Sequence, residues 1–229
     1  MSDQSRRQIW IHWVWANAWA ELIGLGATFL LGYGLFAFLE EPQTPLAVLG
    51  FVLLMTSTGI VEGIIVGWFQ WRIIRSLFEK ISFKRWWLAT LIGALTAWFL
   101  GSLPSNLMNM GAEETGSTPI EPPLVLMLLF AAGMGLVLGV ILGLPQWRVL
   151  QKFVKRAWTW LPANSLAWGA GMALIFAGID LAQRGATIAA TVLIMVLTLF
   201  VTGAMVGAIH GLFLVRLGVK NQLLDEPGA

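Results

Sequence analysis

Two long apolar runs without a single charged side chain constrain this chain more than any other feature. Residues 124–144 and 186–214 contain no Asp, Glu, Lys or Arg. About 20 apolar residues in a helix are enough to cross the hydrocarbon core of a bilayer. Charged residues make up only 11% of the 229 positions, against about 25% in an ordinary soluble domain. The sequence therefore predicts an all-α integral membrane protein.

Apolar stretches bounded by charges or by Pro and Gly clusters predict six transmembrane helices in one domain, 1–229. The first stretch is too long for the apolar part of a signal peptide, and no small-residue cleavage site follows its Trp-rich start. The longest connection, 104–123, contains glutamates and prolines but no basic residue, so we expect an extracytoplasmic loop there. The predicted spans are 11–38, 46–71, 86–103, 124–147, 158–180 and 187–215.

The connections between these spans separate by charge. All but one of the 14 basic residues fall before the first span, after the second, after the fourth or after the sixth. The exception, Arg184, lies in a connection on the other side. Because cytoplasmic loops carry the excess of Lys and Arg, both termini are predicted to be cytoplasmic, in a bacterial inner membrane.

The even-numbered spans share a glycine pattern. A glycine recurs every fourth residue, an arrangement called a glycine zipper, which lets a neighbouring helix backbone approach closely. The first two copies also share a Gln-Trp-Arg tripeptide, beginning at Gln70 and Gln146, whereas the third has Leu214 and Val215 before its arginine. The three copies are Gly59, Gly63, Gly67 and Arg72; Gly135, Gly139, Gly143 and Arg148; and Gly203, Gly207, Gly211 and Arg216.

The odd-numbered spans repeat as well, each with a tryptophan four residues before a small polar residue. If spans two and three match spans four and five, the third hairpin must pair span six with span one through space. We therefore predict a pseudo-threefold bundle of helix hairpins whose repeat is circularly permuted, with parallel rather than inverted repeats. The repeated pairs are Trp13 with Asn17, Trp86 with Thr90, and Trp160 with Asn164.

The string Gly-x3-Gly-x2-Gln-Trp-Arg-Val-Leu at 139–150, followed by Ala-Asn-x3-Trp-Gly at 163–169, carries a family resemblance. It resembles uncharacterised multi-spanning membrane proteins of cyanobacteria and other phototrophic bacteria, over roughly 46–180. The resemblance implies a place in photosynthetic (thylakoid) or respiratory membranes, and it implies no activity.

Two carboxylic acids fall inside predicted spans. Glu21 and Glu62 each lie in the cytoplasmic half of a helix, and a charge in hydrocarbon is costly enough that such a residue faces the bundle interior. One interpretation is a protonated or hydrogen-bonded acid that ties helices together, and this is the preferred one. The other is a proton, ion or pigment-metal site.

His210 in the last span is expected near Glu21, where it forms either a His–Glu pair or a hydrogen bond to a neighbouring helix. A bis-histidine haem is not expected, because His12 is the only other histidine and lies at a different depth. No metal cluster is predicted. Chlorophyll needs one axial ligand, and a carotenoid needs aromatic surface, so both stay open as cofactors. The candidate chlorophyll ligands are Asn17, Glu62, Asn164 and His210.

Polar and basic side chains gather at the cytoplasmic ends of the spans. Gln70 and Gln146 lie one turn before a basic segment, where glutamine can bond a neighbouring backbone. The 13 tryptophans concentrate near the same boundary and are interpreted as an interfacial aromatic belt. The basic residues are either solvated or form a collar for anionic lipid headgroups, with Arg72, Arg75, Arg148, Lys152 and Arg216 as candidates.

The sequence contains no enzyme signature, and the absence of cysteine excludes disulfides and thiolate chemistry. We predict a non-enzymatic accessory or assembly subunit of a photosynthetic or respiratory complex, in contact with lipid and with other membrane subunits but not with nucleic acid. Two alternatives remain: a channel or carrier that uses Glu21 and Glu62, and a pigment-binding subunit.

Overall fold

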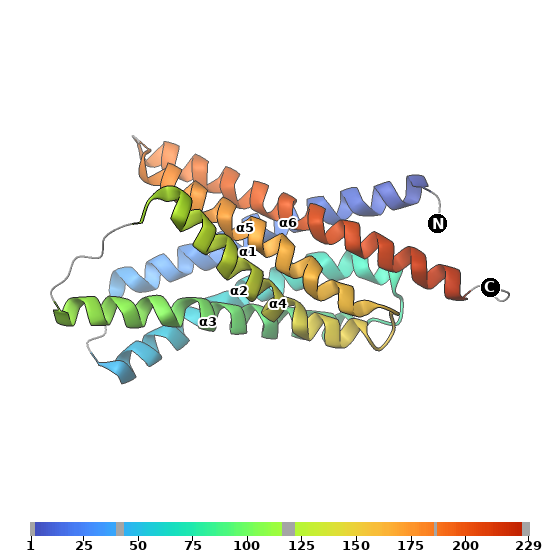
Figure 1. The fold of residues 1–229 in the computed structure, drawn as a ribbon, viewed down its shortest axis with the longest axis horizontal. Coiled ribbons are helices and arrows are strands. Elements are labelled where there is room, and N and C mark those ends of the chain that lie inside the picture. The colour runs from blue at the N-terminus through green and yellow to red at the C-terminus, as the bar shows by residue number, and fades with distance from the viewer. Residues whose placement is uncertain (1–2, 40–43, 116–121, 186, 226–229) are drawn as a thin grey trace.

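A computed structural model of the chain describes residues 3–39, 44–115, 122–185 and 187–225, with the backbone alone described at 103–115 and 219–225. These residues form long helices that lie side by side and no strand (Figure 1), so the all-α prediction is confirmed. The helices are α1 (Asp3–Phe38), α2 (Pro45–Leu77), α3 (Phe83–Thr115), α4 (Leu124–Leu150), the short 3₁₀ helix η1 (Ala157–Thr159), α5 (Trp160–Gln183) and α6 (Ile188–Asp225).

Five stretches of the described residues are long and apolar enough to cross a membrane. The α3 helix, whose side chains are described only as far as Ser102, is not one of them. These five are Asp3–Phe38, Pro45–Leu77, Leu124–Leu150, Ala157–Gln183 and Ile188–Gly218.

The predicted loop 104–123 differs in part from the structure. The α3 helix continues through Pro104 to Thr115, so the first part of that segment is helical. A proline removes only one backbone hydrogen bond, and helices of membrane proteins tolerate the loss when neighbouring groups satisfy the freed backbone. The residues after it include leucine and methionine, which favour helix.

Local sequence signals set some helix ends. Thr44 precedes α2, and its side-chain oxygen accepts a hydrogen bond from the Ala47 N–H at 3.3 Å. Pro45 then occupies the first turn, where a backbone N–H has no partner within the helix. Between α4 and α5 the chain reverses through Arg156, which has a left-handed backbone with φ 60°.

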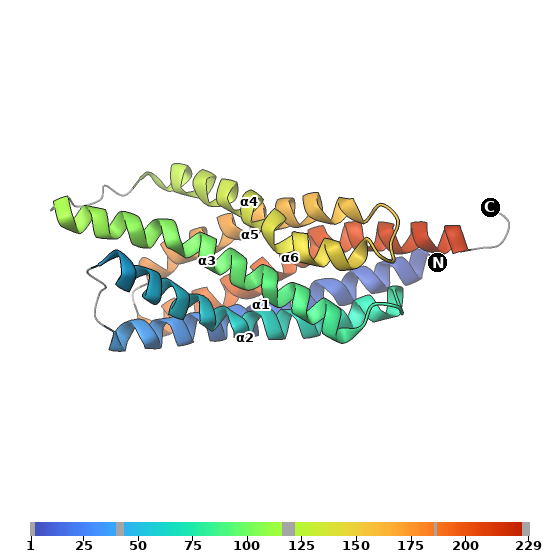
Figure 2. The same cartoon turned by 90° about the horizontal axis from the view of Figure 1, so that it is seen from below.

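The helices form a closed ring. Each packs against the next in sequence, α6 returns to pack against α1, and the closest pairs are α2–α3, α4–α5 and α1–α6. The start of α1 and the end of α6 lie at the same end of the bundle as the α2–α3 and α4–α5 connections (Figures 1 and 2). We call this the basic end, because nearly all of the lysines and arginines are in these segments.

Candidate functional site

Polar side chains from the helices meet inside the ring. Gln70 donates its Nε2–H to Asn17 Oδ1 at 2.9 Å. Gln146 donates its Nε2–H to Gln70 Oε1 at 3.1 Å and to Thr90 Oγ1 at 2.9 Å. The oxygen of Gln146 accepts from Trp160 Nε1 at 2.9 Å. These bonds form one network across α1, α2, α3, α4 and α5, and in a low-dielectric interior such a network holds its members in fixed positions.

The odd helices hold their small polar residues in one shared way. The side chain of each polar residue donates a hydrogen bond to the backbone carbonyl of the tryptophan four residues earlier. This bond fixes the orientation of the polar side chain. The bonds are Asn17 to Trp13 at 2.8 Å, Thr90 to Trp86 at 3.0 Å, and Asn164 to Trp160 at 2.9 Å.

Glycines of the even helices lie against the odd helices at two matching depths. At the first depth, a Cβ placed on the glycine would lie within 3 Å of a backbone Cα: Gly63 opposite Leu91 at 2.9 Å, Gly139 opposite Ser165 at 2.8 Å, and Gly203 opposite Ala18 at 2.8 Å. One turn later it would meet the Cβ of the repeated polar residue: Gly67 opposite Thr90 at 3.4 Å, Gly143 opposite Asn164 at 3.0 Å, and Gly207 opposite Asn17 at 2.9 Å.

The sequence analysis aligned the three glycine repeats by the arginine that follows each of them. The glycine contacts instead shift the third repeat, on α6, by one helical turn relative to that alignment. Gly207, rather than Gly211, takes the position of Gly67 and Gly143. Counting three residues onward, His210 therefore takes the position of Gln70 and Gln146. The prediction that Leu214 replaces the glutamine is wrong, because close backbone packing sets the register and the interfacial arginine does not. Leu214 instead corresponds to Ile74 and Leu150, and all three are fully buried.

His210 is the member of this polar set without a hydrogen bond. It is 2% exposed, and neither ring nitrogen has a hydrogen-bond partner among the described residues. Its ring lies 5.2 Å from the Trp160 ring, tilted by 30°. The predicted His–Glu pair is not formed, although His210 and Glu21 border the same small cavity.

The register predicts the effect of His210→Gln. Each glutamine bonds the polar residue of the preceding odd helix, so a glutamine at 210 is expected to bond Asn164 on α5. One added buried hydrogen bond should raise the free energy of unfolding by about 1 kcal/mol. The measurement is the thermal midpoint of the detergent-solubilised protein, with His210→Leu as the control that fills similar space without a bond. A glutamine variant that melts below the leucine variant would contradict this register.

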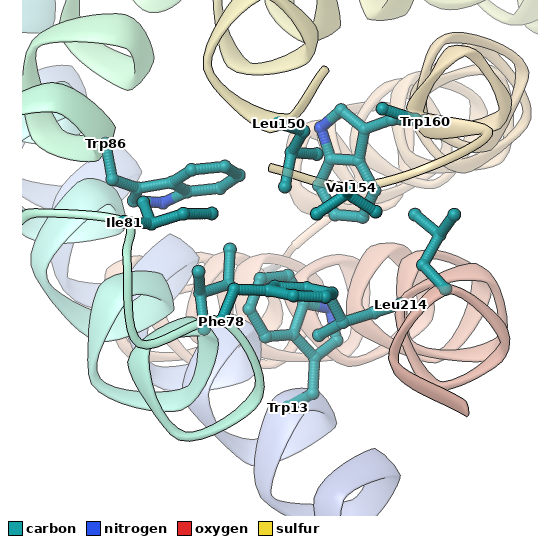
Figure 3. Close-up of a cluster of buried hydrophobic side chains, with 11 residues drawn as sticks. Trp13, Phe78, Ile81, Trp86, Leu150, Val154, Trp160 and Leu214 are labelled. Atoms are coloured by element: carbon teal, nitrogen blue, oxygen red, sulfur yellow. The ribbon is translucent and has the colours of Figure 1, made fainter. Parts of the chain in front are cut away.

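Three tryptophans close the interior toward the basic end. Trp13, Trp86 and Trp160 come from three helices and are all 0% exposed. Figure 3 shows them converging, and the Trp160 ring lies 6.1 Å from each of the other two with edge-to-face geometry. Ile74, Leu150 and Leu214 pack in the same cluster. We call these three rings the tryptophan plug. The belt interpretation is wrong for them, but it suits the exposed Trp68 and Trp158.

A small cavity lies beside the plug, deeper in the bundle. Its volume is about 20 Å³, which is room for one water molecule. Glu21 and Glu62 border it at 1% and 5% exposure, and within the described part of the chain Glu21 Oε2 has no hydrogen-bond partner. A tetrapyrrole cannot enter so small a space, so the sites around it do not fit chlorophyll. The polar side chains that border it are Glu21, Glu62, Gln70, Thr90, Gln146, Asn164 and His210.

Glu62 also borders a second, larger space. Trp98 donates its Nε1–H to Glu62 Oε2 at 2.6 Å, and a Cβ on Gly24 would lie 3.2 Å from Glu62 Cα. Beyond Glu62, away from the basic end, lies a cavity of about 310 Å³ lined by residues of α1 to α5. Glu62 therefore stands between a polar cavity and a much larger apolar one.

The candidate headgroup residues lie exposed at the basic end. Arg72 lies over the Trp68 ring at 4.9 Å and Arg75 over the Trp71 ring at 4.8 Å, while Arg148 lies 5.4 Å from the Trp147 ring. Lys152 is exposed, and Arg216 borders a groove with Arg156. Cation–π contact holds the arginine groups near the surface, and the lipid collar stays a prediction.

All seven polar side chains that the sequence analysis singled out inside the spans are buried, and their roles stay predictions. Sequence reasoning missed Thr90 and Trp98 as partners. The Trp-x3-Thr repeat was a usable signal for Thr90, whereas the bond from Trp98 to Glu62 joins two helices and has no signature. Within the described ranges, no group of three His, Asp or Glu side chains is placed to hold a metal ion.

Comparison of the chain with protein-family models, with curated proteins and with solved structures found no match to any of them.

Proposed function

We propose that the chain is a non-enzymatic integral membrane protein that acts as an accessory or assembly subunit of a larger membrane complex. One observation carries the proposal: a buried hydrogen-bond network joins five of the helices, and the tryptophan plug closes the interior toward the basic end. A channel needs a continuous polar path, and an enzyme needs reactive groups that a substrate can reach. A bundle whose interior is held together in this way instead has a rigid outer surface to which another protein can bind.

The outer surface includes an aromatic patch suited to a partner helix. Trp15 and Trp19 are 52% and 46% exposed, and both rings lie edge-to-face against Phe200 of α6, at 5.8 and 5.3 Å. Tryptophan is enriched where membrane proteins meet the interface and where interfaces concentrate their binding energy. This patch is the proposed contact with the partner subunit.

We further propose that the bundle has six spans in a pseudo-threefold arrangement, with both termini cytoplasmic in a bacterial plasma or thylakoid membrane. The matching glycine contacts of the three hairpins and the charge of the basic end support this. A reporter inserted at 116–121 should be extracytoplasmic, and a cytoplasmic reporter would overturn the orientation. The partner complex would be photosynthetic or respiratory, as the sequence resemblance implies.

The function is tested by purifying the tagged protein from native membranes in mild detergent. We expect it to co-migrate with a large complex on a native gel, with partner subunits identified by mass spectrometry and an absorption spectrum that reports any pigment. Replacing Trp15 and Trp19 together by alanine should release it from that complex, whereas Trp158→Ala at the basic end should not. A colourless, solitary wild-type particle would contradict the proposal.

A small channel or carrier is the second candidate, favoured by the two buried acids and His210 around one cavity. It would require the tryptophan plug to open. Proton or cation flux into liposomes that contain the purified protein, lost in Glu62→Gln, would support it.

A further inference from the structure

The larger cavity has the dimensions and lining of a small-molecule site. Its volume is about 310 Å³, at the lower end of the range of ligand pockets in proteins. It lies inside the helix ring, in the half away from the basic end, and its lining residues come from five helices, α1 to α5. The wall residues are leucine, isoleucine, methionine, phenylalanine, alanine and tryptophan, with Ser102 and Gly101 at one side.

One carboxyl group stands at the floor of this apolar space. Among the described residues that line the cavity, Glu62 is the only ionisable one. The Trp98 Nε1–H holds its Oε2 at 2.6 Å, which fixes the carboxyl in place. A pocket that is apolar except for one oriented polar group selects a ligand that is apolar except at one end.

We propose that this cavity binds one hydrocarbon chain of a small amphiphile, with a neutral hydroxyl or carbonyl at Glu62. An anionic head is disfavoured, because it would lie beside a carboxyl and none of the described lining residues is basic, so its charge would be buried without a counter-charge. At about 30 Å³ for each group the size of a water molecule, the space holds roughly ten chain carbons. This site does not depend on a partner complex, so either proposal can fail without the other.

Photolabelling tests the site directly. The probe is a ten-carbon alcohol with a diazirine in the middle of its chain, added to the detergent-solubilised full chain and mapped by peptide mass spectrometry. We expect saturable labelling of the cavity wall at Met134, Met172 and Phe176. Labelling that does not saturate, or that falls on lipid-facing Leu129 and Val137, would overturn the proposal.

A matched pair of glycine variants separates the cavity from the outer surface. Gly101 lines the cavity, and a Cβ there would lie 3.6 Å from Leu138 Cδ1, so a side chain can enter. Gly133 on α4 is exposed, with nothing within 4 Å of an added Cβ. Gly101→Phe should reduce labelling at least tenfold, and Gly133→Phe should change it by less than twofold. Equal labelling of both variants would contradict the site.

The role of Glu62 is tested by competition. Unlabelled decanol should displace the probe about fivefold more effectively than decyl methyl ether, as one hydrogen bond predicts. Glu62→Gln, which keeps a polar partner, should preserve this preference, and Glu62→Leu should abolish it. An unchanged preference in the leucine variant would remove Glu62 from the proposal. If that variant does not fold, the glycine pair still decides the site.

The same competition distinguishes the natural source of the chain. Straight fatty chains and branched isoprenoid chains share the proposed chemistry, so decanol is compared with geraniol. Stronger competition by decanol indicates a lipid-derived ligand, and stronger competition by geraniol indicates an isoprenoid such as a quinone or carotenoid end. Failure of both to compete at concentrations that leave the protein folded would overturn the proposal.

Discussion

Replacing Trp160 by alanine is expected to lower the free energy of unfolding by about 3–5 kcal/mol, the cost of deleting a fully buried aromatic side chain. The change removes the central ring of the tryptophan plug, which contacts Trp13, Trp86 and His210. It also leaves the Gln146 carbonyl without its donor at 2.9 Å. The measurement is the thermal midpoint of the monodisperse protein in detergent.

Trp158→Ala is the matched control, since it removes the same side chain two residues away. Trp158 is 61% exposed and therefore has little packing to lose. Its midpoint should stay close to that of the wild type. If the two variants have the same thermal midpoint, the tryptophan plug does not hold the helices together. The interpretation of these tryptophans as an interfacial belt would then be preferred.

The second large effect is expected at Gly139. A Cβ there would overlap the Asn164 carbonyl oxygen and would lie 2.8 Å from Ser165 Cα. Both are backbone atoms of α5 and cannot turn aside as a flexible side chain can. Gly139→Leu should therefore force α4 and α5 apart and destabilise the protein by about 3 kcal/mol, the upper part of the usual range for overpacking.

Gly133→Leu provides the comparison within the same helix. An added Cβ at Gly133 meets nothing within 4 Å, and leucine has a higher helix propensity than glycine. This variant should be as stable as the wild type or slightly more so. Fluorescence-detected size exclusion after heating measures both variants, and similar losses in the two would show that α4 and α5 do not pack through Gly139.

Much of the architecture could be predicted from the sequence, because a chain in the hydrocarbon of a bilayer must form long apolar helices. The predicted starts of α2, α4 and α6 lie within one residue of the observed ones, since apolar length, proline and charge all point to the same boundaries. The end of α3 was missed because Pro104 suggested a stop that the helix does not make. A rule based on local sequence registers the hydrogen bond that the proline removes. It does not include the stabilisation that the rest of the helix provides.

The candidate site was predicted as a set of residues but not as an arrangement. Burial of Glu21, Glu62 and His210 follows from the cost of polar groups in hydrocarbon. Their separate roles depend on the helix register, and only backbone contact determines that Gly207 and not Gly211 matches Gly143. The cavity beyond Glu62 likewise is lined by residues of several helices, so no single helix encodes it.

The pairing of α1 with α6 has a consequence for how the protein is made. These two helices form one of the closest pairs in the ring, yet α6 leaves the ribosome well after α1, because α2 to α5 lie between them in the sequence. At about 5–20 residues per second, α1 waits roughly 10–40 seconds for its partner. During that interval Asn17 and Glu21 sit in the bilayer with α2 as their nearest support. Biogenesis is therefore most vulnerable just before α6 is inserted, when insertase or chaperone help would matter most.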